Sequence, residues 1–320
     1  MHALVVDRIG NTPCIQALEH RPPGPDQVCI KVNACALNFA DLLMIEGKYQ
    51  DTPEFPLTLG MEVSGEISAV GANVKGIGSG DPVVAFTGHG GLASEVTVAA
   101  NRCFIRPSHM DDVTGAAFPI AYGTSHLALT RAARLEPGER LVILGAGGGV
   151  GLTAVEIGAA LGAHVTAVAR GADKLVAAKE AGAEVLIDTE TTDDLRAALL
   201  KGDRPNVVYD AVGGTLGEAA MRCLAPEGRH LLIGFASGDL PSLKPNHMLV
   251  KNISAIGFYW GGYLAFRPDL LVGSLKVLAD WHGTGRIQPK ISNVLPFERA
   301  NEGLEVLRSR QSTGKVVITL

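Results

Sequence analysis

Hydrophobic and polar positions form two different patterns in two regions of the chain. From about residue 3 to residue 118, short β-branched runs alternate with glycine and proline turns, which predicts an antiparallel, partly barrel-like β domain. The runs that predict strands there are 27–32, 64–70, 81–85 and 93–98. From about residue 140 to residue 260, apolar runs alternate with alanine-rich segments of helical length, which is typical of repeated β-α-β units.

The apolar runs of the second region predict buried parallel strands, because they are hydrophobic on both faces. They lie at 140–146, 164–170, 184–188, 206–210 and 230–235, with a last strand within 252–260. A final run at 315–320 follows a sheet that is already complete, so we expect it to return to the first domain. The prediction is an α/β protein in which 1–118 and 287–320 form a mostly antiparallel domain and 119–286 form a doubly wound, Rossmann-type domain.

Composition narrows the class of protein and its partners. The chain is 47% hydrophobic and 19% charged with 39 glycines, as expected for a globular α/β protein. It carries 28 basic and 33 acidic side chains without a basic run, which argues against a nucleic-acid partner. No apolar stretch approaches the ~20 residues of a membrane helix, and the first residues lack the pattern of a signal peptide. We therefore expect a cytoplasmic protein that does not bind membranes.

A glycine-rich turn, Gly145-Ala-Gly-Gly-Gly-Val-Gly151, joins a predicted strand to a predicted helix. This context favours a dinucleotide site, with Ala146, Gly148 and Gly151 as the framework residues. Gly148 would let the main chain approach a pyrophosphate, Gly151 would let the helix pack against the sheet, and the amides of the helix start, at Gly149 and Val150, would meet the phosphate charge. Alternatively, the glycines form only a tight connection.

The nature of the dinucleotide is indicated by the end of the next strand. An acidic residue there is typical of NAD-binding sites, but this strand ends in Arg170, with Lys174 one helical turn later. Their charges would pair with a 2′-phosphate, so NADPH is favoured over NADH. Alternatively, both are solvated charges at a helix start, with Asp173 available to neutralise them.

Several motifs together resemble the zinc-free quinone oxidoreductase, or zeta-crystallin, branch of the medium-chain dehydrogenase/reductase superfamily. They are ALNFADLLMIEGKY at 36–49, GMEVSGE at 60–66, GDPVVA at 80–85, the glycine-rich turn, and GKVV at 314–317. The resemblance covers nearly the whole chain. It implies that the first domain is GroES-like and catalytic.

The same resemblance bears on metal binding. Relatives with catalytic zinc place a Cys three residues before an Asp and a His in a Gly-His-Glu segment. In this chain Asn38 and Met61 stand at those positions, and neither an amide nor a thioether is a good zinc ligand. The histidines are isolated from one another. We expect no metal.

Roles for individual residues follow from the resemblance. It implies that Asn38, Phe39 and Asp41 lie beside the nicotinamide and that the hydroxyl of Tyr49 faces the substrate. Alternatively, Asp41 only caps a helix that begins at Leu42, and the ring of Tyr49 only packs at the mouth of the cleft.

Other positions that the resemblance implies around the cofactor are Thr124, Val212, Gly234, Phe235, Tyr259 and Lys315. Loop glycines are equally explained as turns, Tyr259 as packing, and Lys315 as a solvated lysine. Thr189 departs from the family, because many relatives carry a Tyr there that holds the adenosine.

The expected function is NADPH-dependent hydride transfer to a quinone, because no Lewis acid polarises an alcohol. The alternatives are reduction of activated alkenes, such as enones or enoyl and acryloyl thioesters, and a non-catalytic NADPH-binding protein. The partners expected are a small electrophilic acceptor and a second copy of the chain, because the strand within 252–260 commonly forms a dimer in this superfamily.

Overall fold

The computed structural model describes residues 1–19 and 21–320. In it the chain forms two units, of which unit 1 comprises Met1–Ile120 with Ile291–Leu320 and unit 2 comprises Ala121–Lys290. The boundary between them falls inside helix α3 (Pro119–Leu127). Each unit is described by itself.

Unit 1 is built on a seven-stranded, mostly antiparallel sheet in the order β15-β16-β3-β5-β6-β8, with β7 paired to β3. A second, three-stranded sheet has the order β2-β1-β4. The elements are β1 (His2–Val6), β2 (Cys14–Ala17), β3 (Gln27–Leu37), α1 (Phe39–Ile45), β4 (Leu57–Thr58), β5 (Glu62–Val70), β6 (Pro82–Phe86), β7 (Glu95–Ala99), β8 (Cys103–Ile105), α2 (Asp112–Ala116), β15 (Ile291–Pro296), α11 (Ala300–Arg308) and β16 (Lys315–Thr319).

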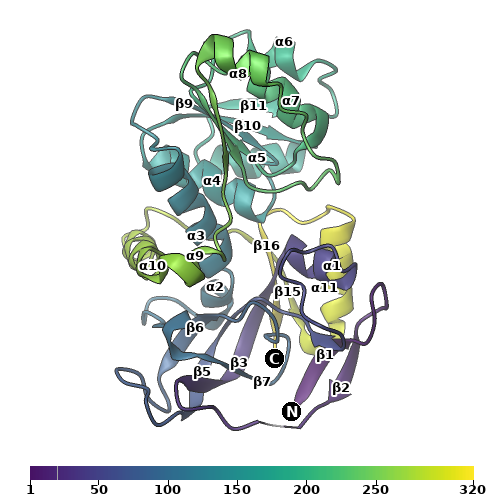
Figure 1. Cartoon of the computed structure of the whole chain (residues 1–320), viewed down its shortest axis with the longest axis vertical. Coiled ribbons are helices and arrows are strands. Elements are labelled where there is room, and N and C mark those ends of the chain that lie inside the picture. The colour runs from purple at the N-terminus through teal and green to yellow at the C-terminus, as the bar shows by residue number, and fades with distance from the viewer. Residues whose placement is uncertain (20) are drawn as a thin grey trace. The chain divides into compact units, whose positions relative to one another are not determined.

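Strand β3 is longer than the pattern predicted, because it has partners along its whole length. Its second half, Ala34 to Leu37, pairs antiparallel with β16 on one side and with β5 on the other. Figure 1 shows the late β16 in yellow beside the early β3. The last strand therefore pairs with a strand formed some 280 positions earlier.

Unit 2 contains a six-stranded parallel sheet in the order β11-β10-β9-β12-β13-β14. The order reverses at β9, as in a doubly wound fold, and this confirms the predicted fold class. The elements are β9 (Arg140–Leu144), α4 (Gly149–Ala160), β10 (His164–Ala169), α5 (Ala172–Glu180), β11 (Val185–Asp188), α6 (Leu195–Leu199), β12 (Val207–Asp210), α7 (Gly214–Cys223), β13 (Arg229–Leu232), α8 (Pro245–Lys251), β14 (Ser254–Gly257), α9 (Tyr263–Phe266) and α10 (Pro268–Gly283).

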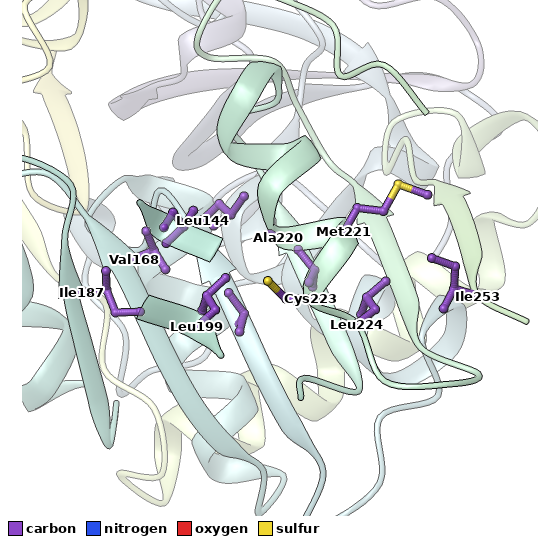
Figure 2. Close-up of a cluster of buried hydrophobic side chains, with 12 residues drawn as sticks. Leu144, Val168, Ile187, Leu199, Ala220, Met221, Cys223, Leu224 and Ile253 are labelled. Carbon is purple, nitrogen blue, oxygen red and sulfur yellow. The ribbon is translucent and has the colours of Figure 1, made fainter. Parts of the chain in front are cut away.

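The central strands β9, β10 and β12 are buried along most of their length, which agrees with their apolar sequences, whereas the edge strands β11 and β14 are more exposed. Figure 2 shows part of the core, where Leu144, Val168 and Ile187 come from three neighbouring strands. Met221 and Leu224, from α7 and its end, complete this cluster. Burying a side chain of this size stabilises the fold by about 1.5–3 kcal/mol.

Several strands are shorter than their apolar runs. Strand β9 ends at Leu144, because Gly145 turns the chain with a φ of +77°. Strand β13 ends at Leu232 and the last strand occupies only Ser254–Gly257. The apolar residues beyond these ends lie in loops at the carboxyl edge of the sheet. Among the described residues, no helix is both long and apolar enough to cross a membrane.

Candidate functional site

The glycine-rich turn connects β9 to α4 at the carboxyl edge of the unit 2 sheet. A Cβ atom at Gly151 would lie 2.0 Å from the carbonyl oxygen of Gly145, so only glycine allows α4 to approach the turn this closely. Gly148 is the N-cap of α4, and a Cβ there would meet nothing nearer than 3.5 Å. Gly151 therefore serves packing, whereas the main chain at Gly148 is accessible.

The start of α4 offers amide donors to an anion. The first bond to the N-cap carbonyl runs from Leu152 N–H to Gly148 O at 2.8 Å, so the amides of Gly149, Val150 and Gly151 lie before the helical ladder. These amides and the positive end of the helix suit a phosphate group. Ala146 differs, because it is fully buried and its own N–H donates to Val168 O at 3.1 Å.

Arg170 directly follows β10, the strand next to β9, and Lys174 lies in the first turn of α5. Arg170 Nε donates to Glu190 Oε1 at 3.2 Å, and both side chains are largely exposed. The carboxylate beside Arg170 is therefore Glu190, whereas the sequence pointed to Asp173. The stem of Lys174 lies against Gly147, where a Cβ would approach it to 2.5 Å.

Thr189 stands between the acidic residues at the end of β11. Its N–H donates to Ala169 O at 2.9 Å and its hydroxyl to the same oxygen at 3.3 Å. The side chain is thus engaged with the neighbouring strand.

Val212 and Phe235 lie in the loops that follow β12 and β13. The Cγ2 atom of Val212 is 3.0 Å from the position of a Cβ on Gly145, and the Cδ1 atom of Phe235 is 2.9 Å from that of a Cβ on Gly213. A Cβ on Gly234 would lie 3.5 Å from the nearest atom. The structure thus brings these loops together beside the glycine-rich turn.

A buried acid and base, which the sequence analysis missed, hold these loops in place. Asp210 Oδ1 accepts from the N–H groups of Val212 and Gly213 at 2.9 and 2.7 Å, and Oδ2 bonds His230 Nε2 at 3.0 Å. Both side chains are fully buried. An acid that ends an otherwise apolar strand is the sequence signal that would have identified this pair.

Thr124 and Tyr259 lie on neighbouring parts of unit 2. Thr124 is buried on α3, and Tyr259 is half-exposed in the loop after β14, with its ring over Gly261. A Cβ on Gly123 would lie 2.5 Å from Trp260 Nε1, so α3 and this loop are in contact.

A second missed group fixes the first turn of α4 to α3. Ser125 Oγ donates to Val150 O at 2.9 Å and lies within hydrogen-bond distance of the hydroxyls of Thr153, at 2.8 Å, and Tyr209, at 3.0 Å. Burial raises the pKa of Tyr209, which therefore stays protonated. Hydroxyls within apolar segments look like ordinary core residues in the sequence, so no signal identified them.

In unit 1, Asn38, Glu62 and Lys315 form a buried polar cluster. Lys315 Nζ donates to Leu37 O at 2.9 Å, to Asn38 Oδ1 at 2.7 Å and to Glu62 Oε1 at 2.8 Å. Asn38 Nδ2 donates to Glu62 Oε1 at 2.9 Å, and Ile120 N–H donates to Glu62 Oε2 at 2.8 Å. The end of β3 and the starts of β5 and β16 bring the cluster together.

The burial of Lys315 corrects one alternative drawn from the sequence. Its side chain is only 5% exposed and that of Glu62 is 0% exposed, so the interpretation of Lys315 as a solvated lysine is wrong. All three ammonium donors are used inside the cluster, so the residue acts by holding Asn38 and Glu62. Glu62 lay within a motif of the family resemblance without a role, because a lone Glu in a strand is usually exposed.

Asp41 anchors the segment that carries Asn38. Its Oδ2 accepts from Asn38 N–H at 2.8 Å in a capping box, and its Oδ1 accepts from Gly60 N–H at 3.0 Å. The helix begins at Phe39 and not at Leu42, so Asp41 is the third helical residue. Burial raises the pKa of Asp41 from 3.8 to about 6, although the two N–H donors favour the charged form.

Phe39 is the first residue of α1, and Tyr49 lies four residues after its last residue, Ile45. Phe39 is 38% exposed, and Tyr49 follows the helix, half-buried, with its carbonyl accepting from the Thr52 hydroxyl at 2.6 Å. The structure thus groups Asn38 with Lys315, and Asp41 with the Asn38 and Gly60 amides, while Phe39 is partly exposed.

The residues at the position of catalytic zinc do not fit a metal ion. Asn38 Oδ1 and Glu62 Oε1 already bind the ammonium of Lys315, whose positive charge would repel a divalent cation. Met61 is buried and offers only a thioether. Within residues 1–19 and 21–320, no group of three or more His, Cys, Asp or Glu side chains is placed to hold a metal.

Two family models match the chain. "Alcohol dehydrogenase GroES-like domain" matches residues 24–108, and "Zinc-binding dehydrogenase" matches residues 149–272. The second match contains neither Asn38 nor Met61, so its description does not bear on that position.

Individual relatives cover nearly the whole chain. The quinone oxidoreductase-like protein 2 homolog of Nematostella vectensis is 37% identical over 300 residues, which are 92% of this chain and 82% of the relative. Escherichia coli quinone oxidoreductase, solved with NADPH, has a TM-score of 0.92 and 25% identity over 100% of both chains. CurK enoyl reductase has a TM-score of 0.89 and 26% identity over 99% of this chain and 98% of its own. The chain therefore belongs to the zinc-free quinone oxidoreductase branch of the medium-chain dehydrogenase/reductase superfamily, as its motifs predicted.

Proposed function

We propose that the chain is an NADPH-dependent oxidoreductase that transfers hydride to a quinone without a metal ion. The observation that carries the proposal is the cluster of Asn38, Glu62 and Lys315, in which the Lys315 ammonium binds Asn38, the residue that stands where zinc-dependent relatives have a Cys ligand. Without a Lewis acid to polarise an alcohol, the acceptor must already be electrophilic. Quinones meet this requirement.

The residues of unit 2 fit the cofactor. The amides at the start of α4 would hold the pyrophosphate, with Gly148 leaving its main chain open. Arg170 and Lys174 would bind the 2′-phosphate, and Val212 and Phe235 would border the nicotinamide with Gly234, Tyr259 and Thr124. When bound, NADPH supplies the hydride. The E. coli relative that was solved with NADPH supports this assignment.

Three residues of unit 1 have roles in the proposal. Tyr49 donates a hydrogen bond to a carbonyl or quinone oxygen of the substrate. Asn38 and Asp41 are positioning residues, because their side-chain oxygens already accept hydrogen bonds from Lys315, Asn38 N–H and Gly60 N–H. Catalysis would then come chiefly from binding and orientation.

Reduction of an activated alkene is the second candidate, because the structure of CurK enoyl reductase is among the neighbours. The test measures NADPH oxidation with quinones, enones and acryloyl thioesters. We expect the highest kcat/KM with a quinone. Enones that react about a hundredfold faster, a difference of about 2.7 kcal/mol, would replace the quinone assignment. Tight NADPH binding without turnover of any acceptor would indicate a non-catalytic protein.

We also propose a homodimer formed through β14. This strand is at the end of the unit 2 sheet, so within residues 1–19 and 21–320 one of its edges has no partner strand, and Leu249 and Val250 of α8, which precedes it, are 78% and 75% exposed. Light scattering after size exclusion should give twice the chain mass of 33.4 kDa, and a monomer would contradict the proposal.

A further inference from the structure

Hydrogen bonds connect the main chain after β10 to the residues at the end of β11. Asp188 Oδ1 accepts from the N–H groups of Gly171, at 3.0 Å, and Glu190, at 2.9 Å, and these bonds lower the pKa of Asp188. Thr189 N–H donates to Ala169 O at 2.9 Å. These three hydrogen bonds leave little freedom to the main chain that carries Glu190.

The Glu190 side chain lies next to the Arg170 guanidinium. The Glu190 carboxylate lies 3.7 Å from the position of a Cβ on Gly171 and accepts from Arg170 Nε at 3.2 Å. Gly171, which follows Arg170 directly, has a φ of +90°, a conformation that favours glycine. The pair therefore lies beside a turn whose main chain is fixed by hydrogen bonds to Asp188.

The net charge of the side chains at the end of β10 is unfavourable for binding a 2′-phosphate. Segments 170–174 and 188–190 carry two basic side chains, Arg170 and Lys174, and three acidic ones, Asp173, Asp188 and Glu190. A 2′-phosphate brings nearly two further negative charges and needs the guanidinium that Glu190 already engages. A ribose with a free 2′-hydroxyl brings no charge and would find in Glu190 a hydrogen-bond acceptor.

We propose that Glu190 is a specificity-determining residue that weakens the preference for NADPH over NADH by competing with the 2′-phosphate for Arg170. This inference rests on the proposed function, because it assigns the 2′-phosphate to Arg170. It goes beyond that function because it identifies a side chain of the protein itself, Glu190, that competes with the 2′-phosphate of the cofactor.

The experiment measures the dissociation constants of NADPH and NADH by fluorescence titration of the full chain, without an acceptor. Glu190→Gln should tighten NADPH binding by about threefold to fivefold and leave NADH binding unchanged or weaker, so that the NADPH preference rises. In an Arg170→Gln background the same change should have less than half this effect, because its partner is gone.

The matched control is Glu184→Gln. Glu184 precedes β11 whereas Glu190 follows it, and it forms a similarly exposed pair with His164 at 2.9 Å. This variant should keep the wild-type preference. A Glu190→Gln preference equal to that of wild type or of the control overturns the inference and leaves the proposed function intact. A wild-type chain that binds neither dinucleotide overturns both, and binding without turnover overturns only the reductase.

Discussion

Two glycines of the same turn should respond in opposite ways to one added methyl group. In Gly151→Ala the new Cβ would lie 2.0 Å from Gly145 O, 2.7 Å from its carbonyl carbon and 3.0 Å from Ala146 Cα. All three are main-chain atoms that cannot rotate away, so α4 must move by about 1 Å or more from the sheet. We expect a loss of about 3 kcal/mol in the free energy of unfolding, at the upper end of overpacking costs.

Gly148→Ala is the matched variant, with the same chemical change three residues earlier. The nearest atom to its Cβ is 3.5 Å away and the φ of Gly148 is −83°, so alanine fits without strain. Stability should be unchanged or should rise by about 0.4–1 kcal/mol, because the unfolded chain loses freedom. The methyl group would nevertheless stand where the pyrophosphate approaches, so the NADPH dissociation constant should increase at least about tenfold.

Thermal unfolding and fluorescence titration with NADPH separate the two effects. Gly151→Ala should melt about 6–12 °C below wild type, whereas Gly148→Ala should melt with wild type and bind NADPH poorly. A Gly151→Ala variant that melts within about 2 °C of wild type would refute the steric argument. Wild-type affinity in Gly148→Ala would refute the placement of the pyrophosphate.

Three further predictions concern unit 1. Lys315→Met removes the cation from the buried Glu62 carboxylate and should lower the free energy of unfolding, measured in urea, by about 3–5 kcal/mol. The double variant Lys315→Met/Glu62→Gln should recover part of this loss. A loss below about 1 kcal/mol in Lys315→Met would contradict the ion pair. The pKa of Asp41 is about 6 in the folded protein and 3.8 for an ordinary Asp, so the folded state binds this proton more tightly than the unfolded state. Protonated Asp41 therefore stabilises the fold fully below about pH 4, and this stabilisation is lost as the pH rises to about 6. Between pH 7 and pH 5, wild type should therefore gain about 1 kcal/mol relative to Asp41→Asn, and parallel pH profiles would rule this out. Tyr49→Phe should lower kcat/KM about tenfold if its hydroxyl meets the substrate, whereas an unchanged kcat/KM would leave the ring with packing alone.

The architecture of unit 2 could be predicted from the sequence because its central strands β9, β10 and β12 are buried along most of their length. An apolar run followed by a helix repeats along that region, and the glycine-rich turn marks the first crossover. The ends of the strands were harder to predict. Residues 233–235 continue the apolar run, but β13 ends at Leu232 and these residues form a loop. Ile233 and Gly234 are half-buried and Phe235 is 41% exposed, so apolar residues at these positions do not mark a buried strand.

The candidate site was only partly readable for a different reason. Asn38 lies in a recognisable motif, but the two side chains that bind it, Lys315 and Glu62, are distant in the sequence. Glu190 was missed because the pair with Arg170 depends on the parallel alignment of β10 and β11, which pattern alone does not give. Long-range pairing of charges is a property of the fold.

The interrupted chain of unit 1 has a consequence for its biosynthesis. Glu62 leaves the ribosome 253 residues before Lys315, the cation that neutralises it. At ~5–20 residues per second, the nascent chain carries this carboxylate without its partner for about 13–50 s, during which all of Ala121–Lys290 is synthesised. Unit 2 can thus fold while the larger sheet of unit 1 still lacks β15 and β16. The synthesis of β16 supplies both the strand that pairs with β3 and β15 and the cation that neutralises the buried Glu62 carboxylate.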